Sequence, residues 1–390
     1  MVIPVMPTYA RAEIAFDRGE GATLFDGHGR RYLDFNAGIG VNALGHAHPG
    51  LVAALQAQAA KLWHTSNLYE IPGQTRLAER LVADTFADTV FFNNSGAEAV
   101  ECGIKMVRKY HDDSGHPERY RIITFEGAFH GRTLATLAAG CQEKHLKGFG
   151  PVVEGFDQVP FADLGAVAAA ITDQSAAILV EPIQGEGGIR RLPEGMLGRL
   201  RGIADAAGIL LFLDEIQCGM GRTGRFFAHE WDGVAPDIMA VAKALGGGFP
   251  IGACLATAAA AKGMTAGTHG STFGGNPLAV AVANAVLDEM LADGFFARVE
   301  AAGKRLHQGL DRLRDKHHNK IDEVRGAGLM LGFRVRGDHG ALVAKLLAAG
   351  LMTVVAGDNV VRLLPPLIVS DAEIDEALAI LDSTLAEADL

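Results

Sequence analysis

Short, continuous apolar runs divide the first two thirds of the chain, and each of them ends in polar or glycine residues. The runs lie at 89–92, 121–125, 176–180, 209–213 and 237–242. An apolar run of this length, without alternation, is typical of a strand buried on both faces of a parallel sheet. We therefore expect these five segments to be neighbouring strands of one sheet.

Segments with a helical spacing of apolar residues lie between these runs. They cover 51–62, 75–83, 95 to about 111, and 196–207. Strands that alternate with helices predict right-handed crossovers, and these place helices on the faces of a mainly parallel sheet. The fold class expected for this part of the chain is therefore α/β.

The pattern changes from about Leu278 onward. Expected helices lie at 278–291, 300–316, 341–349 and 371–386, and expected strands lie at 324–333 and 360–366. Near the N-terminus, residues 21–35 predict a small hairpin around a Gly-His-Gly turn. The C-terminal third is α+β, which indicates a separate, smaller domain.

Composition and charge narrow the classes of function. Of the 390 residues, 49% are hydrophobic and 21% charged, which is typical of a globular chain with a large core. The formal net charge of −11 disfavours nucleic acid and anionic membranes as partners. The uncharged window 244–261 is rich in glycine and contains Pro250, so we expect a glycine loop and then a strand, not a membrane helix.

The cysteine and histidine patterns give no sign of a disulfide framework or a metal site. Four cysteines lie far apart with no Cys-x-x-Cys pair, which is typical of a reduced, cytosolic chain. The N-terminus does not have the pattern of a signal peptide. His46 and His48 lack an acidic or cysteine cluster beside them, which favours loop packing over metal binding.

The first chemical candidates are two charged residues that directly follow buried strands. Asp214 follows the run 209–213, and Lys243 follows the run 237–242. In open α/β sheets, ligands bind at the carboxyl ends of the strands. The two residues fit either a structural ion pair or a pyridoxal phosphate site, with Lys243 as the Schiff-base lysine and Asp214 at the pyridinium nitrogen.

Two loops carry further candidates. Ser95-Gly96-Ala97 begins a helix after a strand, an arrangement that suits a bound anion and equally an ordinary N-cap. On the loop 127–133, Phe129 is suited to stack on a planar ring and Arg132 to pair with a carboxylate, although both residue types are common on loops.

A match to the dinucleotide pattern G-x-G-x-x-G occurs at 219–224. We reject it because no helical pattern follows and because four residues separate it from Asp214, so the tight turn between strand and helix is missing. A nucleotide-binding oxidoreductase built on this motif remains the rival enzyme class. A cofactor-binding regulator is the non-enzymatic rival, but the chain shows no basic DNA-binding arm.

Taken in order, several segments resemble the class III (fold type I) pyridoxal-phosphate aminotransferases over nearly the whole chain. They are 44–49, 62–67, 181–188, 214–224, 243–248 and 269–277. Within that class they are similar to the acetylornithine aminotransferases. The resemblance implies a large domain at 51–277, and a small α+β domain formed by 278–390 together with the N-terminal segment 1–50.

The resemblance also implies roles for individual residues. Lys243 is the residue that binds pyridoxal phosphate and shuttles protons, and Asp214 pairs with the ring nitrogen. Further cofactor contacts are implied for Ser95, Gly96, Ala97, Phe129, Gln217 and, from the partner subunit of a homodimer, Thr272. Substrate contacts are implied for Arg132 with Ser271 nearby, and for Arg362, which Glu186 masks when the other substrate is bound.

The implied reaction is ping-pong transfer of an amino group from N-acetylornithine to 2-oxoglutarate, giving N-acetylglutamate 5-semialdehyde and glutamate in arginine biosynthesis. Ornithine, succinylornithine, succinyl-diaminopimelate and 4-aminobutyrate remain alternative donors. The chain departs from many relatives at Ala97, where they have Thr, and at Val100, where they have Asn. We expect the missing Thr hydroxyl to weaken cofactor retention at most.

Overall fold

A seven-stranded sheet forms the centre of the structure, a computed structural model that describes residues 4–388. The strand order is β4-β12-β11-β10-β7-β5-β6. Their bounds are β4 (Thr89–Asn93), β5 (Arg121–Phe125), β6 (Phe156–Val159), β7 (Ser175–Val180), β10 (Leu210–Asp214), β11 (Ile238–Val241) and β12 (Gly252–Ala256). β10 lies at the middle of the sheet and runs parallel to both of its neighbours, β7 and β11.

The sheet is mainly parallel, as the sequence predicts. β5 also runs parallel to β6 and β7, and β12 is antiparallel to β4 and β11. Parallel strands need long crossover connections, and the helices between the strands supply them. Because parallel strands end at a common edge, the loops after β5, β7, β10 and β11 meet there.

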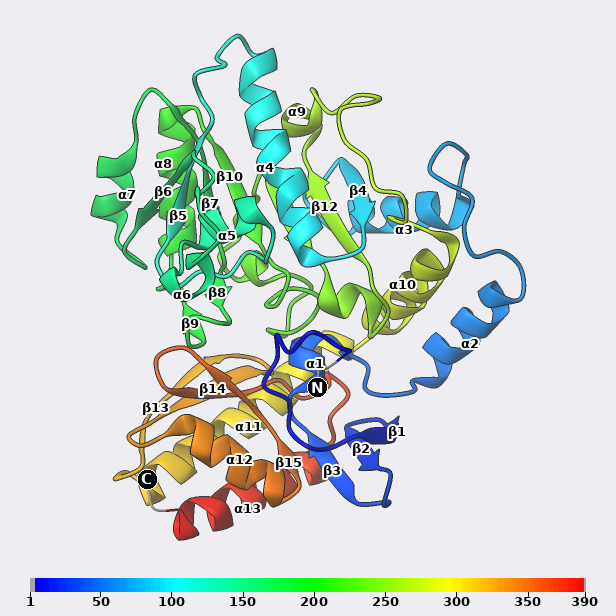
Figure 1. Cartoon of the computed structure of the whole chain (residues 1–390), viewed down its shortest axis with the longest axis vertical. Helices are drawn as coiled ribbons and strands as arrows, with labels where there is room; N and C mark the ends of the chain where they lie inside the picture. The colour runs from blue at the N-terminus through cyan, green and yellow to red at the C-terminus, as the bar shows by residue number, and fades with distance from the viewer. Residues whose placement is uncertain (1–3, 389–390) are drawn as a thin grey trace.

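Helices cover both faces of this sheet (Figure 1). Those with bounds close to the predicted segments are α2 (Pro49–Ala59), α3 (Pro72–Ala83), α4 (Gly96–Asp113), α8 (Met196–Ala207) and α10 (Pro277–Met290). The short elements η1 (Ala228–Trp231), η2 (Lys243–Gly246), α5 (Leu134–Gly140), α6 (Glu143–Leu146), α7 (Leu164–Ala170) and α9 (Ala258–Ala261) complete this part. Leu210 and Phe212 of β10 pack with residues of α4, whereas Leu211 and Leu213 pack in the larger core that includes α8 and α10.

Two smaller sheets lie below the central one in Figure 1. The first has the order β1-β2-β3-β15, with β1 (Phe16–Glu20), β2 (Thr23–Asp26), β3 (Arg31–Asp34) and β15 (Leu351–Met352). The second has the order β13-β14-β17-β16, with β13 (Ile321–Ala327), β14 (Met330–Val335), β16 (Val354–Ala356) and β17 (Val360–Leu363). Helices α11 (Phe295–Lys316), α12 (His339–Ala348) and α13 (Asp371–Glu387) accompany them.

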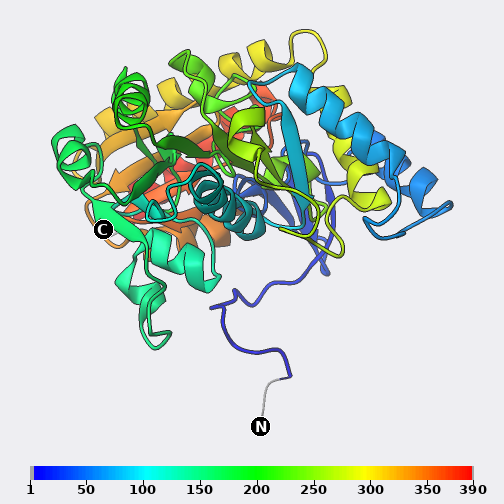
Figure 2. The ribbon, with the colours of Figure 1, turned by 90° about the horizontal axis from the view of Figure 1, so that it is seen from above.

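The N-terminal and C-terminal parts of the chain share one of these sheets, because β15 pairs in parallel with β3. Figure 2 shows residues from 4 up to β1 extending away from the body of the molecule. The domain boundaries expected after residues 50 and 277 stay a prediction. Within the described residues 4–388, no helix is both long and apolar enough to cross a bilayer.

One predicted element is wrong in its extent. The sequence predicts a single strand at 324–333, whereas the chain folds into a hairpin of β13 and β14. The turn lies at Gly328 and Leu329, between the paired residues Ala327 and Met330, and the φ of 54° at Gly328 is in the left-handed region that glycine adopts readily. Because the residues on both sides of the turn are apolar, the hydrophobic pattern alone does not show that the strand ends there. The paired two-residue strands β8 (Ile183–Gln184) and β9 (Arg190–Arg191) were also not predicted.

Candidate functional site

A cavity of about 420 Å³ opens at the edge of the central sheet where the parallel strands end. Its walls come from the start of α4 and from the loops after β5, β7, β10 and β11. The sequence-predicted residues that line it are Ser95, Gly96, Ala97, Phe129, Arg132, Glu186, Asp214, Gln217 and Lys243. The fold therefore brings residues that are up to 148 positions apart (243 − 95) to one cavity.

Lys243 is the first residue of η2, directly after β11, and it lines this cavity. Its φ of 45° is in the left-handed region that residues with a side chain rarely adopt. Burial and, after it, the positive charge of Arg362 lower the pKa of the Lys243 amine to about 8. A lysine with a pKa near neutrality is partly unprotonated at pH 7 to 8, so it can act as a nucleophile and as a base.

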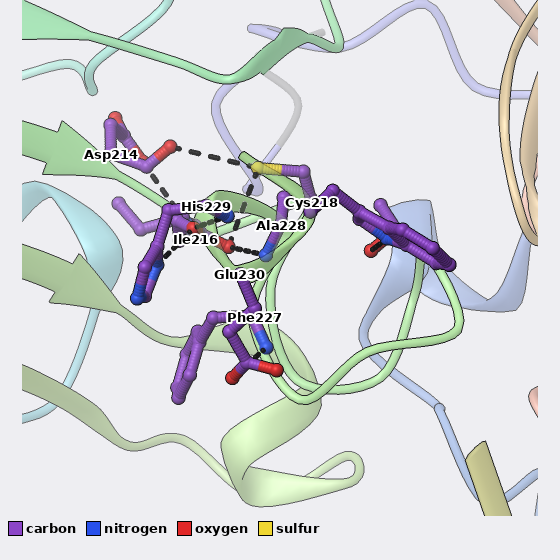
Figure 3. Close-up of polar contacts among 10 residues, drawn as sticks. Asp214, Ile216, Cys218, Phe227, Ala228, His229 and Glu230 are labelled. Atoms are coloured by element: carbon purple, nitrogen blue, oxygen red, sulfur yellow. Dashed lines mark hydrogen bonds and ion pairs between the residues drawn. The ribbon is translucent and has the colours of Figure 1, made fainter. Parts of the chain in front are cut away.

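Asp214 ends β10 and is almost fully buried, with 3% of its surface exposed. Its Oδ2 lies 2.8 Å from Nδ1 of His130, and its Oδ1 accepts a hydrogen bond of 3.1 Å from the Ile216 backbone N–H. Figure 3 shows Asp214 at the end of β10 and Ile216 in the turn that follows it, with Cys218 beside them. These two contacts fix the carboxylate in one orientation at the cavity wall.

His130 and Glu181 form a buried acid–base cluster with Asp214. Burial lowers the pKa of His130, but its contact with Asp214 outweighs burial and raises that pKa above the ordinary value. Burial raises the pKa of Glu181 to about 7. The Glu181 carboxylate also accepts backbone hydrogen bonds from Phe129 (3.0 Å) and Gly185 (3.4 Å), so it ties together the loops after β5 and β7.

The start of α4 forms another wall of the cavity. Ser95 caps this helix by accepting a hydrogen bond from the Glu98 N–H, and Gly96 and Ala97 follow in the first turn. The N–H groups of a first helical turn have no acceptor within the helix, and the helix dipole favours an anion there. A Cβ at Gly96 would lie 2.7 Å from Ile216 Cδ1, so a larger residue does not fit between α4 and the turn after Asp214.

Arg362, on β17, is a fully buried cation beside the cavity. Its Nη1 donates hydrogen bonds to Glu186 Oε1 at 2.7 Å and to Gln217 Oε1 at 2.9 Å, and both acceptors line the cavity. Burial raises the pKa of Glu186, but Arg362 outweighs this effect and holds that pKa below its usual range. Arg362 is thus masked by an acid from a different part of the fold.

Arg132 also lines the cavity, and it is exposed. Its guanidinium is 5.6 Å from the centre of the Phe129 ring, and its Nη2 lies 3.2 Å from Nε2 of His145. Burial and the charge of Arg132 both lower the pKa of His145, so the neutral imidazole accepts this hydrogen bond. An arginine held this way at a cavity rim is suited to bind a carboxylate.

Ser271 and Thr272 do not line the cavity formed by their own chain. The Ser271 hydroxyl contacts Asn94, a cavity residue, at 3.1 Å, whereas Thr272 is exposed. Asn67 donates hydrogen bonds to the Ser271 and Gly274 carbonyl oxygens, at 3.0 and 2.9 Å. The two segments around Asn67 and Thr272 therefore lie side by side.

The residues of the cavity fit pyridoxal phosphate. A lysine with a lowered pKa suits the aldehyde of this cofactor, a buried and oriented aspartate suits its ring nitrogen, and the start of a helix suits its phosphate. Phe129 is placed on the cavity wall, as a residue that stacks on the ring requires.

The sequence analysis did not single out three residues of this site. His130 and His145 lie on or near the loop that carries Phe129 and Arg132, and Glu181 begins a segment that supports the resemblance. The spacing of these residues in the sequence does not indicate that they belong to the site. Only the tertiary structure shows that His130 and Glu181 surround Asp214.

Comparisons with known proteins agree with this geometry. Residues 6–385 match the family described as aminotransferase class-III. The chain is 63% identical to an acetylornithine aminotransferase of Mesorhizobium japonicum, over 95% of this chain and 93% of that protein. It is similar to the solved N-acetylornithine aminotransferase of Stenotrophomonas maltophilia, with a TM-score of 0.85, 42% identity and 97% of each chain covered.

A second solved structure is similar in fold at a lower sequence identity. It is an ornithine aminotransferase of Toxoplasma gondii with partial occupancy of pyridoxal phosphate at its active site. The TM-score is 0.94 with 33% identity, and the match covers 98% of this chain and 92% of that one.

Proposed function

Because this chain belongs to the class-III aminotransferase family, whose cofactor is pyridoxal phosphate, we propose that it transfers the amino group of N-acetylornithine to 2-oxoglutarate. The products are N-acetylglutamate 5-semialdehyde and glutamate, which places the enzyme in arginine biosynthesis. The observation that carries this proposal is a pair of arginines at the cavity that Lys243 lines. Arg132 is exposed at the cavity rim, and Arg362 is buried and masked by Glu186.

The two arginines suit two different substrates. An ω-amino donor presents its carboxylate far from the reacting amine, so it can pair with Arg132 while Glu186 keeps Arg362 masked. Glutamate carries a carboxylate next to its amine and a second one farther away, so it needs both arginines. Movement of Glu186 away from Arg362 frees that guanidinium without leaving it unpaired once the carboxylate binds.

Bound pyridoxal phosphate supplies an electron sink for the carbon that bears the amino group. Asp214, held by His130 and the Ile216 N–H, would keep a proton on the ring nitrogen of the cofactor. Lys243 is placed to remove a proton from the substrate carbon and to return it, and its pKa near neutrality suits both directions. Ser95, Gly96 and Ala97 would hold the phosphate, Gln217 would contact the ring hydroxyl, and Phe129 would stack on the ring.

A half-reaction tests the choice of donor. The visible spectrum of the holoenzyme is recorded after separate additions of N-acetylornithine, ornithine and 4-aminobutyrate, without an oxo acid. We expect rapid conversion with N-acetylornithine and slow or no conversion with the other two. Faster conversion with ornithine or 4-aminobutyrate would overturn the choice of donor and leave the family assignment intact. N-succinylornithine and succinyl-diaminopimelate, compared in the same way, test the preferred acyl group.

We also propose a cytoplasmic homodimer in which Thr272 completes the cofactor site of the partner subunit. Large apolar side chains on the two adjoining segments around Asn67 and Thr272 support this proposal. They are Leu62, Trp63, Leu68, Tyr69 and Phe273, of which Leu68 is 87% exposed. An apolar patch of this kind marks a protein interface, because a monomer rarely leaves so many large side chains in water.

Complementation between two inactive variants tests the shared site. In a mixed dimer of Lys243→Ala and Thr272→Asp, one site contains both substitutions and the other contains neither if Thr272 acts across the interface. Random reassembly then restores about one quarter of the wild-type activity, since half of the dimers are mixed and each has one intact site. If Thr272 acts within its own chain, every site keeps one defect and no activity returns.

A further inference from the structure

A second cavity, of about 470 Å³, lies between α4, β12 and the segment 264–269. Two buried cysteines form part of its wall, Cys102 on α4 and Cys254 on β12. None of the residues that line it belongs to the cavity of the cofactor site. The proposed transamination therefore leaves this group of sulfur atoms unexplained.

Polar groups converge on Cys102 from one side of this cavity. The Lys105 ammonium donates hydrogen bonds to the Thr268 carbonyl oxygen at 2.8 Å and to Nδ1 of His269 at 2.9 Å. An ammonium group can only donate, so Nδ1 is the acceptor and the neutral imidazole carries its proton on Nε2. The His269 ring is thereby held in the tautomer that leaves one N–H free to donate.

Cys102 receives contacts from both neighbours, the Cys254 thiol and the His269 ring. The hydrogen bond from Cys254, together with the contact with His269 and the charge of Lys105, lowers the pKa of the Cys102 thiol to about 6 against the effect of burial. The same contact raises the pKa of Cys254, which keeps its proton. The pair thus consists of one thiolate and one thiol in contact.

The other two cysteines have different surroundings. Cys141 is exposed, and Cys218 is buried with the acids Glu215 and Asp214 near it. Burial and the charge of Glu215 raise the pKa of Cys218 well above its ordinary value, so this thiol stays protonated. These two residues provide an exposed and a buried control for the reactivity of the pair.

We propose that Cys102 and Cys254 form a reactive dithiol site that is oxidised by small hydroperoxides and closes to a disulfide. The thiolate of Cys102 attacks one peroxide oxygen, so an S–O bond forms and the O–O bond breaks. The leaving hydroxide takes a proton and departs as water. The Cys254 sulfur then attacks the Cys102 sulfur, the S–S bond forms, and the S–O oxygen leaves with the Cys254 proton as a second water.

The test follows all four thiols in the intact holoenzyme. The protein is treated with one equivalent of hydrogen peroxide at pH 7, its remaining thiols are blocked under denaturing conditions, and its peptides are analysed by mass spectrometry without reduction. We expect a Cys102–Cys254 cross-linked peptide, and loss of the Cys102 thiol at least about tenfold faster than loss of the Cys141 or Cys218 thiol.

Two variants separate the roles of the pair. In Cys254→Ser, we expect Cys102 to accumulate as a sulfenic acid that dimedone traps, because the second thiol is gone. In His269→Phe, we expect the pH profile of Cys102 alkylation by iodoacetamide to move to higher pH, while that of Cys141 stays unchanged.

Oxidation of Cys102 no faster than that of Cys141 or Cys218 would overturn the proposal, and so would absence of the cross-linked peptide. The measurement needs no turnover, so its outcome does not depend on the donor substrate. Unchanged thermal midpoints of both variants, measured by circular dichroism, show that they are folded. If either variant does not fold, the oxidation rates of the four thiols in the wild-type protein are sufficient to test the proposal.

Discussion

Lys243 shows how one residue is prepared for chemistry by its position. Its φ of 45° costs about 1 to 3 kcal/mol for a residue with a side chain, and the tight turn from β11 into η2 maintains this conformation. The turn directs the amine into the wall of a cavity, where burial and Arg362 lower its pKa to about 8. The backbone conformation therefore places the amine where burial and Arg362 keep it partly unprotonated.

The lowered pKa of Lys243 predicts how cofactor uptake depends on pH. Only the neutral amine attacks the aldehyde of pyridoxal phosphate, so the rate of uptake by the apoenzyme should rise with pH through a midpoint near 8. Visible absorbance after stopped-flow mixing measures this rate. In Arg362→Leu one cause of the lowered pKa is absent, so the midpoint should move to higher pH.

A matched control for Arg362→Leu is Arg325→Leu, which removes an arginine whose partners, Glu323 and Asp358, do not line the cavity. This control should keep the midpoint near 8. A midpoint near the ordinary lysine pKa in the wild-type protein would contradict the assignment of Lys243.

His130 is expected to tune the site through Asp214. In His130→Asn, the buried Asp214 carboxylate loses its 2.8 Å partner. We expect kcat to fall about tenfold or more and pyridoxal phosphate to dissociate faster. Loss of a residue that orients a group contacting the cofactor typically changes activity or affinity about 10- to 100-fold. The free energy of unfolding should fall by about 1 to 3 kcal/mol.

His229→Asn is the control for this variant. His229 Nδ1 lies 2.8 Å from Glu215 Oε1 in a second buried pair, and neither residue lines the cavity. The control should lose similar stability, measured by urea denaturation, while its kcat changes little. Equal losses of kcat in the two variants would mean that His130 acts through stability alone.

At the scale of elements, α4 links the two cavities. Its first turn lines the cofactor cavity, and Cys102, six residues beyond Gly96, lines the other one. Phe212 of β10 packs so closely against Gly103 of this helix that a Cβ there would lie 2.2 Å from the ring. The helix is therefore fixed against the same strand that carries Asp214.

Gly96→Ala tests how tightly the first turn of α4 must pack. The added Cβ would lie 2.7 Å from Ile216 Cδ1, so Ile216 must move, and with it the turn that holds Asp214 and Gln217. We expect the Kd for pyridoxal phosphate to rise about tenfold, measured by fluorescence titration of the apoenzyme. This rise corresponds to a loss of about 1.4 kcal/mol of binding free energy.

The control for this variant is Gly198→Ala in α8, where the added Cβ would meet only Val234 Cγ2 at 3.9 Å. Cofactor affinity should not change there, and stability should rise by up to about 1 kcal/mol because alanine is the better helix former. Unchanged cofactor affinity in Gly96→Ala would show that the contact with Ile216 adapts at little cost.

At the scale of the whole molecule, the site depends on elements from the middle of the chain and from its C-terminal part. Arg362 comes from β17, which lies in the same sheet as β13 and β14. Gln217 lies in the loop after β10 of the central sheet, and Glu186 lies between β8 and β9. Arg362 and Glu186 are 176 residues apart in the sequence. The buried ion pair therefore joins the C-terminal sheet to the central one at the cavity.

The proposed dimer predicts a coupled loss of assembly and activity. In the double variant Trp63→Asp with Leu68→Asp, two charges replace side chains that are 63% and 87% exposed in the single chain. We expect monomers in sedimentation velocity, and at least a tenfold loss of activity because the partner's Thr272 is absent. A dimeric, fully active double variant would contradict the proposed interface. Val152→Asp, at a 49% exposed loop residue, is the control and should leave the assembly unchanged.

Much of the fold follows from the sequence, because local pattern and burial agree there. The strand at 121–125 and the helix at 196–207 occur with the predicted bounds. The hairpin β13–β14 was missed because its turn depends on glycine φ angles and not on polarity. The roles assigned to Ser271 and Thr272 stay predictions, since a single chain does not place them in the cavity.

The sequence by itself determined the order of strands and helices, the residue types at the strand ends, and the resemblance to a pyridoxal-phosphate family. These features are local, since apolar runs and short motifs act over a few residues. Only the tertiary structure decided which charges meet. The contacts of His130 with Asp214, of Arg362 with Glu186 and of Lys105 with His269 join residues far apart in the chain. Such contacts, and the pKa values that depend on them, arise from burial and distance in space, which the spacing of residues along the sequence does not encode.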